Sequence, residues 1–372
     1  MAKPSLTNLP ARRLERGFRG LAARHMKRPF SRHAKVRLMF YHDPNRISYA
    51  QVYPFFHYAD ALFERYGVEV RAEPFDAILD GTANAQNTAD IVILQPWFTI
   101  APNDLTRAIE QITKQHTGAS VSFLDSYAHN DLRLARYLPE DLAFYIKKSL
   151  FETPSDYLNT YRGDTQMMQY YADQYGITAE APDFQTPPTI IDKLRLSPNF
   201  LTAPHFVFGF DQQPPPITGR PLDMQLRLGK KGGPIYAAMR NAALGAVDRI
   251  AHLKTSPQGA MPYDAYMAEM RSAKLCFSPF GFGELCWRDI EAIQTGAVMI
   301  KPDMSHLQTL PDLYEPGVTY LPVKWDFSDL DDVVAHALAN PVQCQTIANT
   351  AWNRAKQYLD SGQFVDDVSY LF

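Results

Sequence analysis

The chain has 372 residues, of which 46% are hydrophobic and 21% are charged, with a formal net charge of −3. This length suits about two folded domains. No run approaches the roughly 18 apolar residues that cross a bilayer, the basic start lacks the apolar region of a secretory signal, and three cysteines are too few for a disulfide framework or a zinc site. We therefore expect a cytoplasmic protein.

Positive charge is concentrated at the start of the chain. Residues 1–37 hold eleven lysines and arginines and one acid, which leaves 26 basic and 39 acidic residues elsewhere. Leu14, Phe18 and Leu21 recur at helical spacing, which predicts a basic amphipathic arm over 1–34. Such an arm can contact an anionic membrane, and a solvated helix is the alternative. The acidic remainder predicts no nucleic-acid partner, because phosphate binding needs clustered positive charge.

From Lys35 onward, short apolar runs alternate with amphipathic segments. Repeated strand–helix units predict a mostly parallel sheet with helices on both faces. The expected strands of this first series are 36–41, 68–70, 91–94 and 119–125, and the expected helices are 51–66 and 103–116.

Residues 126–200 interrupt this alternation. They are rich in tyrosine, aspartate and proline, and we expect a helical insertion with helices near 139–150 and 164–175. Three consecutive prolines make 211–219 the expected linker, because such prolines stiffen a chain and cannot join a sheet.

A second alternating series follows the linker. Its expected strands are 222–227, 274–278, 297–301 and 318–323, and its expected helices are 236–250, 262–272, 284–295, 328–339 and 341–360. We therefore predict an α/β fold of two facing Rossmann-like domains, 35–210 and 220–340, with C-terminal helices over 341–372. Ligands of such sheets bind beyond the carboxyl ends of the strands.

The segment 273–303 carries the most specific information. A strand runs into a turn that contains Gly281 and Gly283, where backbone N–H groups can approach a phosphate and a following helix favours negative charge. On that helix Glu284, Arg288 and Glu291 should share one face. Arg288 could pair with phosphate oxygens and Glu291 could accept sugar hydroxyls. The alternative interpretation is a surface ladder of ion pairs.

The longer sequence pattern of this segment resembles the donor-binding signature of glycosyltransferases with two Rossmann-like domains, the GT-B fold. The pattern shared by the exostosin-like and group 1 families appears here as Ser278-Pro279, the glycine turn, and Glu291-Ala292-Ile293-Gln294-Thr295-Gly296-Ala297-Val298. The arginine three residues before Glu291 is closer to the exostosin-like form. Group 1 members have seven residues between their paired glutamates, whereas six separate Glu284 from Glu291, so retaining chemistry is left open.

A basic, glycine-rich loop follows the first strand of the second domain. In the resembling folds such loops neutralise a leaving diphosphate, which predicts this role for Arg227 and Lys230. An ordinary exposed turn is the alternative. No paired-aspartate metal motif stands out, and the resemblance implies a nucleotide-sugar as co-substrate with neither cofactor nor metal.

The first domain should supply the acceptor side and a general base. Strand ends point to Asp125 and His42, with His129 and Asp131 nearby, although such residues often cap turns. Asp125 is slightly preferred.

These observations together indicate an enzyme. It would transfer a sugar from a nucleotide-sugar to a glycan or lipid-linked saccharide in surface polysaccharide or lipopolysaccharide synthesis. The alternatives are a sugar-nucleotide epimerase of the same fold and an inactive glycan-binding protein.

Overall fold

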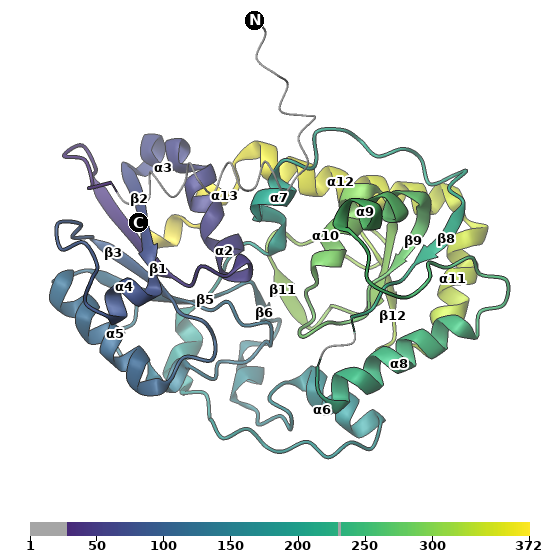
Figure 1. Cartoon of the computed structure of the whole chain (residues 1–372), viewed down its shortest axis with the longest axis horizontal. Helices are drawn as coiled ribbons and strands as arrows, with labels where there is room; N and C mark the ends of the chain where they lie inside the picture. Colours follow the sequence, from purple (N-terminus) through teal and green to yellow (C-terminus); the bar gives the residue numbers. More distant parts are fainter. Residues whose placement is uncertain (1–27, 230–231) are drawn as a thin grey trace, which may run out of the picture.

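The computed structural model describes residues 28–229 and 232–372, which form two α/β lobes (Figure 1). In the first lobe six parallel strands run in the order β2-β1-β3-β4-β5-β7. β1 and β3 are interior strands, where Phe40 and Ile93 are fully buried, as expected for apolar runs covered on both faces. The strands are β1 Val36–His42, β2 Val68–Pro74, β3 Ile91–Gln95, β4 Ser120–Leu124, β5 Tyr145–Lys147 and β7 Leu194–Leu196.

The helices of the first lobe follow the predicted pattern with one division. The helix expected over 51–66 begins at Arg46 and breaks at Tyr58, so it is two helices. The C-cap glycine Gly67 ends the second of them in the left-handed conformation, which a residue without Cβ adopts most readily. The helices are α2 Arg46–His57, α3 Ala59–Tyr66, α4 Phe75–Leu79, α5 Pro102–Gln115 and α7 Pro204–Val207, with short 3₁₀ turns at Ala135–Tyr137, Pro154–Leu158, Pro188–Lys193 and Phe200–Thr202. The helix α6 (Gln166–Gln174) comes from the same part of the chain but packs against α8 (Pro234–Asp248) of the second lobe, where Tyr171 OH donates to the Trp325 carbonyl (Figure 1).

The helix expected near 139–150 is wrong. This stretch forms β5, which pairs in parallel with β4, and then β6 (Ser149–Phe151). Tyr145 and Ile146 are residues that pack well on a pleated, buried surface. Pairing with the neighbouring strand β4 therefore makes this segment a strand, and the local spacing of apolar residues does not reveal that pairing.

The second lobe repeats the strand order of the first. Its parallel sheet runs β12-β10-β9-β8, and an isolated parallel bridge from Met224 to Thr255 stands where the first lobe has β2. The strands are β8 Leu222–Gln225, β9 Ala273–Phe277, β10 Val298–Pro302 and β12 Leu321–Val323, and the helices are α8 Pro234–Asp248, α9 Tyr263–Ser272, α10 Trp287–Thr295, α11 Leu330–Ala339, α12 Pro341–Ser361 and α13 Phe364–Asp367, with a final 3₁₀ turn at Ser369–Leu371.

Two connections tie the lobes together. β6 pairs antiparallel with β11 (Leu307–Thr309) of the second lobe. After crossing the molecule, α12 leads into a C-terminal segment that packs on the first lobe, where the Phe364 ring lies 4.9 Å from the Phe55 ring (Figure 1). The loops that follow β4 and β9 also meet, with Gly283 against the Ala128 carbonyl.

Residues 211–219 run without helix or strand between α7 and β8. The predicted basic arm lies outside the described residues over 1–27, and 28–34 contain no helix. Within the described parts of the chain, no helix combines the length and apolarity needed to cross a bilayer.

Candidate active site

A buried aspartate fixes the turn between β9 and α10. Asp289 accepts hydrogen bonds from Ser278 Oγ at 2.5 Å and Tyr314 OH at 2.8 Å. Its carboxylate also receives the Cys286 N–H at 2.9 Å and lies 3.1 Å from Lys301 Nζ. Both charged groups are fully buried, so their geometry is held by mutual pairing and by these donors. The turn is therefore a rigid support for the residues beside it.

The same network explains why α10 begins later than expected. Asp289 receives the backbone N–H of Cys286, so the helix starts at Trp287 and Glu284 precedes it. The predicted common face of Glu284, Arg288 and Glu291 is consequently wrong, since only the last two lie on the helix.

Arg288 and Glu291 point inward, Arg288 toward the residues that follow β8 and β9, and Glu291 toward α9. The Arg288 guanidinium reaches Ser278 Oγ at 3.4 Å and the Arg227 carbonyl at 3.3 Å. Glu291 is buried and accepts a hydrogen bond from Tyr266 OH at 2.9 Å. Burial raises the pKa of Glu291, and Tyr266 and Arg288 only partly offset this effect. The surface-ladder alternative does not describe these two side chains.

Beside Arg288 and Glu291 lies a pocket of about 800 Å³ between α8 and α9. Arg227 and Tyr266 belong to its wall and connect it to the two α10 side chains. Its lining is mainly apolar, with polar groups at a few points, which is typical of sites for small organic ligands. The lining residues are Arg227, Leu228, Gly229, Ala237, Arg240, Asn241, Leu244, Gln258, Gly259, Ala260, Met261, Tyr263 and Tyr266.

Sequence reasoning missed the α8 contribution to this pocket. Arg240 and Asn241 lie on a helix that was predicted, but nothing in its spacing showed which face the pocket would take. Tyr263 and Tyr266, one turn apart at the start of α9, were also not assigned to the site. These tyrosines lie far along the chain from the glycine-rich loop, so nothing in the sequence shows that the two meet in one pocket.

The basic loop after β8 differs from its predicted role in one respect. The Arg227 side chain forms a two-pronged ion pair with Glu269, at 2.6 and 2.7 Å, and donates to the Gly259 carbonyl. It therefore shapes the pocket wall through α9. Lys230 lies outside the described residues.

Gly283 and Glu284 lie where the two lobes meet. A Cβ on Gly283 would stand 2.0 Å from the Ala128 carbonyl oxygen of the first lobe, so this glycine permits the close approach of the lobes. Glu284 is buried 3.8 Å from His306. Burial alone would raise the Glu284 pKa, but His306 and His129 hold it below its ordinary value. Gly281 closes the turn by donating its N–H to the Gly283 carbonyl at 2.9 Å.

In the first lobe the structure places Asp125 in a saturated position. One carboxylate oxygen accepts the Tyr127 N–H at 2.8 Å, and the other accepts Tyr145 OH at 2.8 Å and Lys147 Nζ at 2.7 Å. Lys147 is itself buried. Both oxygens are therefore committed to holding the loop after β4, which leaves Asp125 poorly suited to accept a substrate proton.

His42 lies at the end of β1, and its hydrogen bonding determines which ring nitrogen carries the proton. Its Nδ1 lies 2.8 Å from the Asp43 carbonyl oxygen, which can only accept, so Nδ1 carries the proton and Nε2 keeps its lone pair. Burial lowers the His42 pKa and favours the neutral ring. This arrangement suits a general base better than that of Asp125.

Two further cations lie at the meeting of the lobes. Arg46, at the start of α2, places its guanidinium 4.3 Å from the centre of the Trp287 ring at the start of α10. Lys148 is buried and donates to the carbonyls of Ser126 and Tyr127 at 3.0 and 2.9 Å. Neither was singled out from the sequence, because each acts across a gap of many residues.

One group of the described residues has the spacing of a metal site. The ligand atoms of His129, Asp131 and Asp164 lie within 4.8 Å of one another. The Arg133 guanidinium already bridges the two carboxylates, at 2.7 Å from Asp131 and 2.8 Å from Asp164. Arg133 thus provides the positive charge that balances this acidic pair.

The comparisons with known proteins rest on structure. No protein-family model matches the sequence, and no curated protein matches it significantly. An alpha-glucosyltransferase in complex with UDP and a 13-mer DNA containing an HMU base aligns with a TM-score of 0.50 and 8% identity, over 89% of this chain and 99% of that one. An alpha-glucosyltransferase in complex with UDP-glucose and DNA containing an abasic site aligns with a TM-score of 0.50 and 9% identity, over 90% and 99%.

These matches confirm the predicted fold class, two facing Rossmann-like domains of the GT-B type. At such low identity they establish the fold alone.

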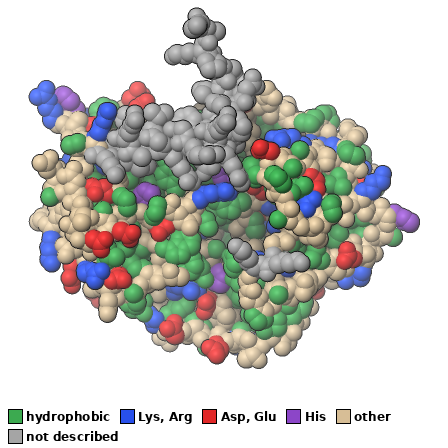
Figure 2. Space-filling view, in the orientation of Figure 1, with side chains coloured by type: hydrophobic (Ala, Val, Ile, Leu, Met, Phe, Trp, Pro, Cys, Tyr) green, Lys and Arg blue, Asp and Glu red, His purple; other side chains and the backbone are tan. Residues whose placement is uncertain are grey.

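The expectation of no nucleic-acid partner is corrected by the same comparisons, because both of these matching structures hold DNA. The expectation rested on net charge, which averages over the whole surface, whereas a phosphate responds to the local potential. Figure 2 shows acidic and basic side chains interspersed over the visible face. Net charge therefore does not exclude DNA from a particular part of this molecule.

Proposed function

We propose that the protein is a glycosyltransferase that uses a nucleotide-sugar donor. The observation that carries this proposal is the pocket between α8 and α9, which lies beside Arg288 and Glu291 at the carboxyl edge of the second sheet. Open α/β sheets bind ligands at this edge. Because both matching alpha-glucosyltransferases hold UDP or UDP-glucose, we propose a UDP-hexose as the donor.

Each part of the donor has a partner in this arrangement. The nucleoside lies against the apolar wall of the pocket, with Tyr263 and Tyr266 at one side. Glu291 accepts hydroxyl groups of the ribose, and Arg288, held at the strand ends, neutralises the diphosphate as the sugar leaves. Lys230 remains a candidate for the same charge by its sequence position, whereas Arg227 acts through the pocket wall.

The order Arg288, Glu291 and Gly296 supports an exostosin-like donor domain within the GT-B glycosyltransferases. We further propose that transfer needs no divalent metal, since Arg133 balances the acidic group described above. Chelation with EDTA should then leave turnover unchanged.

The acceptor enters from the first lobe. His42 takes the proton of the attacking hydroxyl through Nε2, which its hydrogen bond to the Asp43 carbonyl leaves unprotonated. We propose a glycan or lipid-linked saccharide of a surface polysaccharide as the acceptor. DNA is the second candidate, favoured by its presence in both matching structures.

Isothermal titration with UDP, GDP and ADP tests the donor site directly. We expect UDP to bind, and Arg288→Ala and Glu291→Ala each to weaken it tenfold or more. Arg354→Ala and Glu315→Ala, which break an ion pair remote from the pocket, should bind as the wild type does. If none of the three nucleotides binds, the chain is an inactive relative of these enzymes.

Incubation of the wild type with UDP-glucose then separates the enzyme classes. Transfer to an oligosaccharide supports the glycan acceptor, and transfer to a duplex that carries hydroxymethylated bases supports DNA. Conversion of the donor sugar without any acceptor would instead identify an epimerase.

For the arm we propose contact with an anionic membrane at its cytoplasmic face, supported by the excess of arginine over 1–34. Removal of residues 1–34 should abolish sedimentation with phosphatidylserine vesicles. Unchanged sedimentation of the shortened chain would contradict the proposal.

A further inference from the structure

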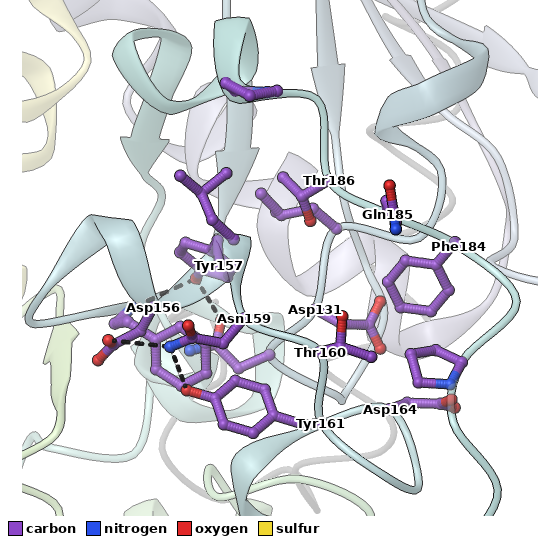
Figure 3. Close-up of a pocket in the computed structure, with 16 residues that line it drawn as sticks. Asp131, Asp156, Tyr157, Asn159, Thr160, Tyr161, Asp164, Phe184, Gln185 and Thr186 are labelled. Atoms are coloured by element: carbon purple, nitrogen blue, oxygen red, sulfur yellow. Dashed lines mark hydrogen bonds between the residues drawn. The ribbon is translucent and has the colours of Figure 1, made fainter.

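A second pocket, of about 300 Å³, lies within the first-lobe insertion (Figure 3). Its wall comes from 130–132, Phe151, 156–161, Asp164, Pro182, 184–186 and Pro188, so it shares no residue with the pocket between α8 and α9. The ring of Phe184 stands on one side and those of Tyr157 and Tyr161 on the other, with Asp131 and Thr160 between them (Figure 3). The site is thus a polar space framed by aromatic rings.

The lining distinguishes between classes of ligand. It combines aromatic rings with carboxylate, amide and hydroxyl groups, and none of its residues is lysine, arginine or histidine. A neutral sugar meets both needs, because its C–H face packs on a ring while its hydroxyls donate to carboxylates and accept from amides. A phosphorylated ligand would face carboxylates with no cation in the lining to pair with it.

One buried donor of the lining has no acceptor. Asn130 is 1% exposed, and its Oδ1 accepts the Tyr157 hydroxyl at 2.6 Å. Its Nδ2 has no hydrogen-bond partner within the described part of the chain. A buried donor that stays unsatisfied is unfavourable, and because Nδ2 has almost no accessible surface, it bonds an oxygen of an occupant once the Asn130 amide turns toward the pocket.

The acidic side of the pocket is held in place from behind. Arg133 bonds to Asp131 and to Asp164, and its guanidinium lies 5.7 Å from the centre of the Phe184 ring. It thereby orients both carboxylates. Arg133 engages both oxygens of Asp131 but only Oδ2 of Asp164, so among the described residues Asp164 Oδ1 is the oxygen left for a hydroxyl donor.

The pocket also adjoins the contact between the lobes. His129, next to Asn130, forms a hydrogen bond with Tyr236 of α8, and its Nδ1 lies 3.9 Å from Asp131. The His129 side chain therefore lies between the pocket wall at Asn130 and Asp131 and the second lobe at Tyr236.

We propose that this pocket binds a neutral saccharide unit. Its service as a subsite for the acceptor rests on the proposed glycosyltransferase function, whereas saccharide binding itself does not. Stacking on Phe184 and Tyr161 and the hydrogen bond from Asn130 would select the sugar.

Binding of the full-length protein to an array of neutral and anionic glycans tests the proposal, followed by titration with the best neutral oligosaccharide. Phe184→Ala and Tyr161→Ala, both at partly exposed positions, should each weaken that oligosaccharide at least tenfold. Phe63→Ala, at an exposed phenylalanine outside the pocket, is the matched control and should bind normally. UDP affinity should be the same in all three variants.

The proposal is overturned if no neutral glycan binds, if only anionic glycans bind, or if Phe184→Ala and Tyr161→Ala bind as Phe63→Ala does. If the wild type binds the neutral saccharide but not UDP, the proposed donor function is wrong, whereas the proposed saccharide site is supported.

Discussion

Each lobe holds a buried aspartate, lysine and tyrosine at the carboxyl edge of its sheet. Asp125 pairs with Lys147 and Tyr145 in the first lobe, and Asp289 pairs with Lys301 and Tyr314 in the second. In both trios the carboxylate is saturated by donors, so each serves to hold a loop. A buried carboxylate at a strand end is therefore weak evidence of chemistry unless one of its oxygens is unengaged.

The lobes differ in the cation beside the trio. In the second lobe it is Arg288, which stays charged at any working pH and makes only long hydrogen bonds, at 3.3 and 3.4 Å. In the first lobe it is Lys148, whose ammonium group is engaged by two carbonyls and whose pKa burial lowers to about 7. Of these two cations beside the trios, Arg288 is the one that keeps its charge at any working pH.

The largest effect should come from breaking a trio. Lys301→Met leaves Asp289 buried without its counter-charge, and we expect a loss of about 3–5 kcal/mol in the free energy of unfolding. Lys147→Met should cost a similar amount in the first lobe. Urea denaturation measures both, with Lys274→Met as the control, since its partly exposed ion pair with Asp223 contributes about 1 kcal/mol or less. A loss in only one lobe would show that the trios are not equivalent.

The next effect separates the two arginines near the pocket. Arg288→Ala should weaken UDP binding about 10- to 100-fold, the equivalent of one or two charge-assisted hydrogen bonds. Arg227→Ala should weaken UDP binding less, because the Arg227 guanidinium is already paired with Glu269. Titration of both variants decides this, and equal losses would mean that Arg227 turns toward the ligand.

A structural feature could be predicted from the sequence when its physical cause lies in neighbouring residues, and could not when the cause lies far along the chain. The apolar runs of β1 and β3 predict buried strands, because a strand that is covered on both faces has consecutive apolar residues. The strand at Tyr145 depends on its neighbour β4, and the start of α10 depends on the side chain of Asp289, three residues after the N-cap Cys286. Arg288 and Glu291 were found because a helix places them together, whereas Arg46 and Arg240 reach the site from distant segments.

A smaller effect tests the contact between the lobes. Gly283→Ala places a Cβ against the Ala128 carbonyl and should cost about 1–3 kcal/mol of stability, because this contact is between backbones and cannot relax by a change of rotamer. Gly229→Ala is the matched control, since a Cβ there meets nothing within 4 Å. Differential scanning calorimetry of the two variants measures the difference. Equal melting temperatures would indicate that the lobes separate easily at Gly283.

The smallest effect concerns the pH dependence that distinguishes Lys148 from Arg288. The folded pKa of Lys148 is about 7, below its ordinary value of 10.5, chiefly because of burial and then because of Lys147, while Asp125 and Glu284 oppose the shift. Between these two values the unfolded chain binds a proton that the folded chain lacks, so this lysine makes stability rise with pH, by at most about 1.4 kcal/mol per pH unit. Urea unfolding at pH 7.5, 8.5 and 9.5 should show that rise in the wild type and in Lys114→Met, an exposed lysine on α5, and a smaller rise in Lys148→Met. If the wild type and Lys148→Met differ by the same amount at every pH, Lys148 titrates like an exposed lysine, and the first lobe carries a permanent charge after all.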